Sequence, residues 1–156
     1  MESSSVLERK VIVFQLKEEE FAISVQQVGG IERMLPITRV PQTANFVKGV
    51  INLRGVVTPV IDLRKRFGIE EVPYGESTRI ILVHLDELEV GLIVDAANDV
   101  IDIPEEGIEP APEVVGAVDI DYIEGVAKLQ DRLLILLNLN RVLSENEVDD
   151  LKSVKE

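Results

Sequence analysis

The hydrophobic positions of this chain alternate with polar ones or gather in short unbroken runs, and polar turn residues separate them. Residues 10–16 (KVIVFQL) and 20–25 (EFAISV) form one such pair, and residues 49–53 (GVINL) and 56–61 (VVTPVI) form another. Short β-branched runs joined by tight polar turns predict β-hairpins. The pattern therefore predicts a protein built mainly of β-strands.

Further strands are expected near residues 33–37, 79–85, 89–94, 99–103, 125–129 and 132–137. Helices are expected to be few and short. One helical turn at 63–67 would begin at the N-cap Asp62 and end at Gly68, and a short polar helix would cover 145–155. Pro59 has no N–H, so its strand is expected to be an edge strand or to be bulged there.

Two gapless alignments within the chain indicate an internal duplication. Residues 10–31 align with 79–100 at an offset of 69, and residues 46–68 align with 122–144 at an offset of 76. Few identities survive, but the apolar positions, the turns and the helix starts coincide. A repeated supersecondary unit of this kind predicts two similar small β-barrels, closed to limit free strand edges.

The duplication also predicts the domain organisation. We expect one domain over residues 10–144, made of two barrels of about five strands each that correspond to the repeat halves 10–68 and 79–144. Residues 1–9 are expected to be a flexible N-terminus, and 145–156 a C-terminal helix and tail. Several strands are apolar on both faces, so packing of the barrels against each other would cover part of the second face. The remainder would be an exposed apolar patch that marks a partner site.

The composition excludes several classes of protein. The chain has 156 residues, of which 46% are hydrophobic, and this is too apolar for a disordered chain. Its longest apolar runs fall far short of the ~20 residues that a membrane span needs, and we expect no signal peptide and no membrane insertion. The absence of cysteine excludes disulfides, thiol nucleophiles and cysteine-ligated zinc. The single histidine, His84, lies in a strand pattern and is expected to be structural, with no metal site.

The charge is strongly acidic overall and unevenly distributed. Sixteen Lys and Arg face 29 Asp and Glu, giving a net charge of −13, which argues against nucleic-acid binding. Residues 31–68 hold seven basic and two acidic residues, whereas residues 69–127 hold sixteen acidic residues and one basic residue. We expect an electropositive face that orients a partner. Alternatively, Arg64, Lys65 and Arg66 are the solvated side of a short helix.

Catalytic motifs are missing, and two rival functions remain. No glycine-rich phosphate loop is present, and the acids at 119–124 do not have the spacing of a calcium loop. A small hydrolase using Asp62 and Asp95 would need an enclosed cleft and a raised pKa. A nucleic-acid binder would use the basic segment 33–66, where Phe46 and Phe67 occupy core-like positions and offer poor stacking platforms.

Residues 39–68, RVPQTANFVKGVINLRGVVTPVIDLRKRFG, resemble the signature stretch of the CheW family of chemotaxis coupling proteins. The similarity extends over roughly residues 10–144, through VFQL, VGLIVDAANDV and YIEGVAKLQDRLLILLNLNRVL. It implies two five-stranded SH3-like barrels and a non-catalytic adaptor without cofactors. Family members couple the cytoplasmic tips of transmembrane chemoreceptors to the regulatory domain of the histidine kinase CheA. A coupling protein of a parallel system that controls pilus or surface motility is the alternative.

The resemblance also implies a cytoplasmic protein recruited to membrane-associated receptor arrays, and we expect it to be monomeric when free. Position by position, it assigns the arginine of the NLRG turn, Arg54, to the receptor-binding groove. The full receptor-binding set is Gly49, Val50, Asn52, Arg54, Val28 and Ile31. The kinase-binding set is Ile12, Val25, Val28, Asn98 and Asp99, with the last two in a turn.

Two alternatives bear on these assignments. Arg54 could instead pair within the chain with Asp62 or another acid. The stretch 25–31 is expected to be helix-like and to line the receptor groove, but Gly29 and Gly30 together cost about 1–2 kcal/mol of helix propensity. The helix is therefore expected to end early.

Overall fold

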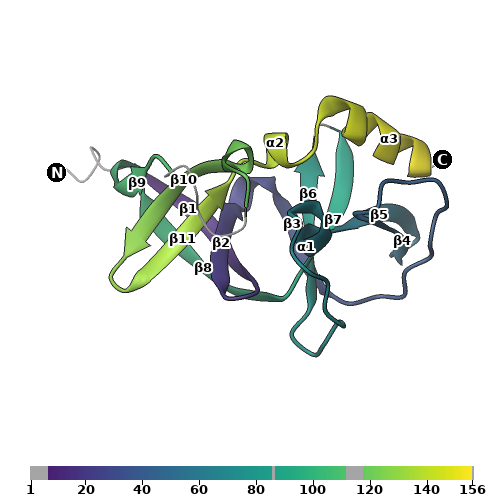
Figure 1. Cartoon of the computed structure of the whole chain (residues 1–156), viewed down its shortest axis with the longest axis horizontal. Helices are drawn as coiled ribbons and strands as arrows, with labels where there is room; N and C mark the ends of the chain where they lie inside the picture. Colours follow the sequence, from purple (N-terminus) through teal and green to yellow (C-terminus); the bar gives the residue numbers. More distant parts are fainter. Residues whose placement is uncertain (1–6, 86, 112–117, 156) are drawn as a thin grey trace.

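The computed structural model describes residues 7–85, 87–111 and 118–155 and has two β-sheets, each curled into a small barrel (Figure 1). Barrel A, on the left of Figure 1, has the strand order β8-β1-β2-β11-β10-β9. Its strands are β1 (Glu8–Leu16), β2 (Glu19–Ser24), β8 (Ala96–Pro104), β9 (Ile108–Glu109), β10 (Ile123–Leu129) and β11 (Arg132–Leu137). The predicted all-β class with two SH3-like barrels is confirmed, although this sheet has six strands.

Barrel B has the order β3-β6-β7-β5-β4. Its strands are β3 (Val28–Arg33), β4 (Val47–Leu53), β5 (Val56–Asp62), β6 (Arg79–Leu85) and β7 (Leu88–Val94). The strand expected at 33–37 is wrong, because β3 ends at Arg33. In the same way, β1 begins at Glu8, inside the segment expected to be flexible, and residues 1–6 lie outside the described residues.

The helices are short, as expected. They are α1 (Leu63–Arg66), α2 (Leu139–Val142) and α3 (Glu145–Lys155), with 3-10 turns η2 (Val25–Gln27), η3 (Glu105–Gly107) and η4 (Ile120–Tyr122). Asp62 caps α1, because its carboxylate accepts a hydrogen bond from the Arg64 N–H at 2.9 Å. The helical conformation expected over 25–31 stops at Gln27, and the chain continues as strand β3.

The repeated elements follow the two predicted offsets. Strands β1, β2 and β3 correspond to β6, β7 and β8 at an offset of 69, and β4, β5 and α1 correspond to β10, β11 and α2 at an offset of 76. The assignment of one barrel to each half is nevertheless wrong. Strand β3 pairs with β6 in barrel B, and β8 pairs with β1 in barrel A. Each barrel therefore contains strands from both halves, because a strand pattern does not specify its partner.

Strand β5 lies inside its sheet, between β7 and β4, and is in register at Pro59, so neither the edge position nor the bulge expected at Pro59 is found. The register shift of this pair lies on β4, between Val47 and Gly49. Pro59 is opposite Val50 of β4, and the parallel pairing with β7 begins only at Val60. The proline therefore precedes the ladder in which its missing N–H would be required.

The apolar side chains form three clusters, one inside each barrel and one between them. The cluster inside barrel A consists of Val11, Val13, Ala22, Ile103, Ala127, Leu134 and Leu136. The cluster inside barrel B consists of Ile51, Leu53, Val60, Ile80, Leu82 and Ile93. The largest cluster joins the outer faces of the two barrels and contains the stacked rings of Phe14, Phe21 and Phe67. Packing of the barrels thus covers most of the second apolar face, as expected.

Helix α3 lies over barrel B along the top of Figure 1, beyond α2. Arg66 of α1 holds it there, with Nη1 and Nη2 donating to the Glu147 carboxylate at 3.0 and 2.9 Å and Nε donating to the Val142 carbonyl at 2.7 Å. The same guanidinium stacks on Phe46, 4.7 Å from the ring centroid. Buried Leu151 anchors the helix to the inter-barrel cluster.

Candidate partner-binding surfaces

Arg54 stands at the tip of the turn between β4 and β5. The turn is held by Asn52, whose Oδ1 accepts a hydrogen bond from the Gly55 N–H at 2.7 Å, and Arg54 itself has a φ of 52°. The Arg54 side chain is 74% exposed, and its Nη2 lies 3.0 Å from Glu32 Oε2 on β3. The internal partner is therefore Glu32 and not Asp62, and it engages one of the five N–H donors. A surface pair of this kind is worth about 1 kcal/mol or less, so it leaves Arg54 available to a partner.

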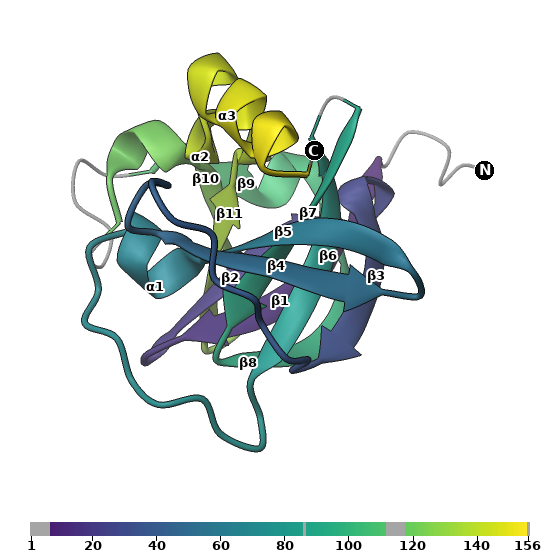
Figure 2. The same ribbon diagram turned by 90° about the vertical axis from the view of Figure 1, so that its right-hand side faces the viewer.

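Exposed apolar side chains lie on the two strands that carry or adjoin this ion pair. Ile31, next to Glu32, is 42% exposed, and Val56 and Val57 after the turn are 51% and 43% exposed. We call Ile31, Glu32, Arg54, Val56 and Val57 the turn surface. Figure 2 shows the β4–β5 turn beside β3, which is why residues distant in sequence meet there. Glu32, Val56 and Val57 are not in the receptor-binding set expected from the sequence. The alternating pattern of their strands does not distinguish them from buried positions, and only the folded barrel shows them at its surface.

The other residues assigned to the receptor groove have different surroundings. Gly49 is buried, and a Cβ there would lie 2.1 Å from the Thr38 carbonyl oxygen. Val50, half-buried, forms a two-bond bridge with Thr38, in which the N–H to carbonyl oxygen distances are 2.8 and 2.9 Å. Val28 is half-buried against the inter-barrel cluster. The structure therefore brings Asn52 and Arg54 together in one exposed turn, leaves Ile31 exposed on the neighbouring strand β3, and assigns Gly49 a packing role.

The kinase-binding set is not a single exposed patch. Ile12 is only 6% exposed and lies in the inter-barrel cluster, so it cannot serve as a surface contact. The resemblance to the family places it in this set, whereas the apolar pattern of β1 on both faces leaves its burial open. Val25 is half-buried on η2 and packs on the same cluster. Val100, the cross-strand neighbour of Ile12, is 54% exposed and was not anticipated.

Asn98 and Asp99 lie within strand β8, so the turn expected there is wrong. Asp99 Oδ1 is 3.6 Å from Arg132 Nη2, and Arg132 also donates to the Glu20 carboxylate at 3.1 and 2.9 Å. Asp99 remains on the surface, with 43% of its side chain exposed. Any partner that binds Asp99 therefore competes with this cluster of three charges.

The expected electropositive face is neutralised where it was thought to be strongest. The side chains of Arg64 and Arg66 are 11% and 16% exposed and pair with Asp95 and Glu147. Lys65 pairs with Glu71 at 3.1 Å. The electropositive face expected over residues 31–68 is therefore neutralised at these three residues, and Arg64 and Arg66 are not the solvated side of a helix either. The acids that fold onto these two arginines lie far away in sequence, whereas the acid of Lys65 lies six positions away.

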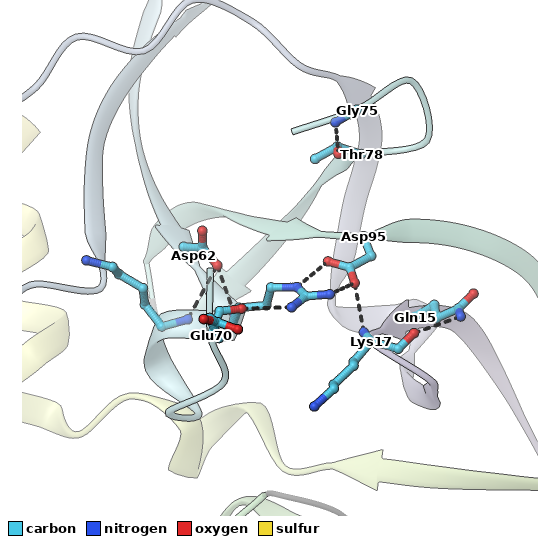
Figure 3. A network of polar contacts seen from close by, with 9 residues as sticks. Gln15, Lys17, Asp62, Glu70, Gly75, Thr78 and Asp95 are labelled. Atoms are coloured by element: carbon cyan, nitrogen blue, oxygen red, sulfur yellow. Dashed lines mark hydrogen bonds and ion pairs between the residues drawn. The ribbon is translucent and has the colours of Figure 1, made fainter. Parts of the chain in front are cut away.

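Asp62 and Asp95 do not form the catalytic pair that the hydrolase hypothesis requires. The Asp62 carboxylate caps α1 and accepts a hydrogen bond from the Tyr74 hydroxyl at 3.0 Å. The Asp95 carboxylate accepts from Arg64 Nε at 2.8 Å and from the Lys17 N–H at 2.7 Å (Figure 3). Each acid is thus held by its own donors, and the network ties α1 of barrel B to the β1–β2 turn of barrel A.

The pKa of Asp95 is shifted in the direction opposite to that of a catalytic acid. Burial alone would raise it, but the hydrogen bonds from Arg64 and Lys17 and the charge of Arg64 outweigh burial and lower the pKa. Because the folded pKa lies below the unfolded value of about 3.9, the carboxylate stabilises the fold above that pH. The contribution is lost as the pH falls through the folded pKa.

Asp95→Asn is therefore expected to lower the urea midpoint at neutral pH, and its difference from wild type should shrink below about pH 4. Urea titrations from neutral to strongly acidic pH measure this difference. Asp131→Asn, in the exposed β10–β11 turn, is the control and should leave the midpoint unchanged. A deficit of Asp95→Asn that is equal at every pH would contradict the prediction.

The lone histidine and the remaining described groups offer no metal centre. His84 is 55% exposed on β6, with Nε2 3.9 Å from Glu89 Oε2. Across residues 7–85, 87–111 and 118–155, no three His, Cys, Asp or Glu side chains are grouped so as to hold a metal ion. No helix in this described part is long and apolar enough to cross a membrane.

Comparisons with known proteins agree with this architecture. The model of the CheW-like domain matches residues 10–147. A chemotaxis protein CheW of Bacillus subtilis is 49% identical over 136 residues, which cover 87% of each chain. The CheW of Klebsiella aerogenes is 37% identical, with 90% of this chain and 84% of that protein covered.

A solved structure shows the same fold. The crystal structure of the scaffolding protein TtCheW from Thermoanaerobacter tengcongensis matches with a TM-score of 0.83 and 40% identity. The match covers 90% of this chain and 96% of that one. The similarity spans nearly the whole chain and includes the two barrels with exchanged strands. The chain therefore belongs to the CheW-like family, whose members are non-catalytic scaffolding proteins of chemotaxis.

Proposed function

We propose that this protein couples the cytoplasmic tips of chemoreceptors to the regulatory domain of a histidine kinase, in cytoplasmic arrays beneath the membrane. The observation that carries the proposal is the turn surface. A guanidinium on a rigid turn presents donors that match a carboxylate or a helix-end carbonyl, and exposed apolar side chains flank it. Such a combination suits a helical receptor tip. The chain would act as a single domain over residues 10–144, monomeric when free.

The kinase would bind elsewhere, on a surface that includes Val25 and Val28 and the backbone of β8 at Asn98 and Asp99. Val25 and Val28 keep part of their apolar surface accessible. Asp99 provides an exposed charge on an edge strand. Two separate surfaces would allow both partners to bind at once. Titration of the chain with a receptor cytoplasmic fragment and a kinase regulatory domain tests this, and failure of a ternary complex to form would refute the coupling role.

Arg54→Glu is expected to weaken receptor-fragment binding by about tenfold or more, because charge-assisted hydrogen bonds are lost and a repulsive charge replaces them. Kinase binding should be unchanged. Val25→Lys should show the reverse pattern. Isothermal titration with each purified partner measures both affinities, and circular dichroism verifies the fold.

Gln130→Glu is the matched control for Arg54→Glu. Gln130 occupies the equivalent turn of barrel A, is exposed, and has the same φ of 52°. The substitution Gln130→Glu therefore introduces the same acidic side chain as Arg54→Glu, in a turn of the same geometry. Equal receptor affinities for Arg54→Glu and Gln130→Glu would remove the turn surface from the receptor site.

A further inference from the structure

Two arginines lie directly opposite each other at the end of the β3–β6 ladder. Arg33 of β3 pairs with Arg79 of β6 in the antiparallel register. Ile31 pairs with Ile81 two positions earlier, so Arg33 and Ile31 share one face of β3, and Ile31 is 42% exposed there. Like charges in directly opposite positions destabilise an antiparallel pair.

Nothing in the described part of the chain neutralises this pair. Arg79 Nη1 donates to the carbonyl oxygens of Glu76 and Thr78 at 2.7 and 2.9 Å, which fixes the side chain without balancing its charge. Neither Arg33 nor Arg79 forms an ion pair with a carboxylate of the described residues. Of the other arginines, Arg9, Arg54, Arg64, Arg66 and Arg132 are paired with acids, whereas Arg39 and Arg141 have no carboxylate partner among the described residues. Arg33 and Arg79 differ from these last two because they face each other in a ladder.

The internal duplication shows that the fold does not require this arrangement. At the offset of 69, Arg79 corresponds to Lys10 and Arg33 corresponds to Asp102, and these two residues also face each other across β1 and β8. Barrel A therefore carries opposite charges where barrel B carries like charges. The difference between the two equivalent ladders points to a missing anion.

We propose that Arg33 and Arg79 bind a carboxylate side chain of the receptor's cytoplasmic segment. This inference rests on the proposed coupling function and extends its receptor site. A carboxylate has two oxygens that can accept from both guanidiniums. Exposed Ile31 on the same face offers an adjoining apolar contact. Glu32, between Ile31 and Arg33, points to the opposite face of β3 and pairs with Arg54 of the β4–β5 turn, so Arg33 and the Arg54 ion pair lie at the same end of this strand. Figure 2 shows β3 and β6 side by side next to that turn.

The substitution Arg33→Asp recreates the opposite-charge pattern of barrel A. It is expected to raise the thermal midpoint of the free protein while it lowers receptor-fragment affinity about tenfold. A purely structural role would move stability and binding in the same direction. Lys128→Asp, which makes the same charge change at a 68% exposed position of barrel A, is the control and should leave receptor affinity unchanged.

A second measurement tests the anion site without the receptor. Thermal unfolding is compared in sodium sulfate and in sodium chloride at equal ionic strength. Wild type should gain more from sulfate than Arg33→Asp does, because general salting-out effects are common to both. Equal gains would overturn the anion site. If Arg33→Asp loses the sulfate effect but keeps the receptor affinity of the wild type, the receptor assignment would be overturned. If the wild type binds no receptor fragment, the coupling function would be refuted, and the sulfate result alone would decide whether the anion site exists.

Discussion

Ile12→Lys is expected to destabilise the fold strongly and not merely to remove a docking contact. Ile12 is 6% exposed and packs in the cluster between the barrels, opposite Ile23 on β2. A lysine there would bury an ammonium group with no carboxylate to receive it and would lose the apolar contacts as well. We expect a loss of about 4 kcal/mol or more, a large part of the ~5–15 kcal/mol that stabilises a typical domain.

Urea unfolding followed by circular dichroism measures this effect. Val100→Lys is the matched control, because Val100 is the cross-strand neighbour of Ile12 and is 54% exposed. The free energy of unfolding of Val100→Lys should differ from that of the wild type by about 0.5 kcal/mol or less. An Ile12→Lys protein with a wild-type midpoint would show that the barrels do not bury this position.

Gly49→Ala is expected to have the second largest effect on stability. Gly49 has a φ of +144°, which L side chains rarely adopt, and a Cβ there would approach the Thr38 carbonyl oxygen to 2.1 Å. The strand cannot retreat without breaking the bridge between Thr38 and Val50. We expect about 3 kcal/mol of destabilisation.

Gly55→Ala separates the cost of the positive φ from the cost of the steric clash with Thr38. Gly55 also has a positive φ, +87°, but nothing lies within 4 Å of its added Cβ. It should therefore cost only the backbone strain, about 1–2 kcal/mol. Chemical unfolding of both variants measures the difference, and equal losses would mean that the close approach to Thr38 is relieved in solution. A receptor defect of Gly49→Ala would then reflect a contact and not a packing failure.

The duplicated glycine shows which part of the fold could be predicted from the sequence. Gly49 and Gly125 are identical across the repeat, and at Gly125 a Cβ would lie 2.7 Å from the Glu109 carbonyl oxygen. The alignment identified the pair, but the reason is the passage of another segment over each position. That segment is the stretch at Thr38 in barrel B and strand β9 in barrel A.

The candidate site was predictable in part. Arg54 and Asn52 could be placed on a turn from the sequence, because the turn is local and its residues are adjacent. Glu32, the partner of Arg54, could not, since the two residues are brought together only by the closure of barrel B. The basic segment failed for the same reason, because Arg64 and Arg66 meet acids 31 and 81 positions away.

What the sequence determined by itself is the set of elements: the hairpins, the caps, the C-terminal helix and the two repeats with their offsets. These depend on side-chain period and on contacts between neighbours in the chain, which a sequence states directly. Only the tertiary structure decided which strands pair, and hence that β3 and β8 are exchanged between the barrels. It also decided that Ile12 is buried while its neighbour Val100 is exposed. Strand β1 is apolar on both faces, and hydrophobic burial has no direction, so its pattern does not say which face meets the other barrel. Val100 lies directly opposite Ile12 and shares its face of the sheet, but it is on the edge strand β8, and only the fold leaves that edge uncovered.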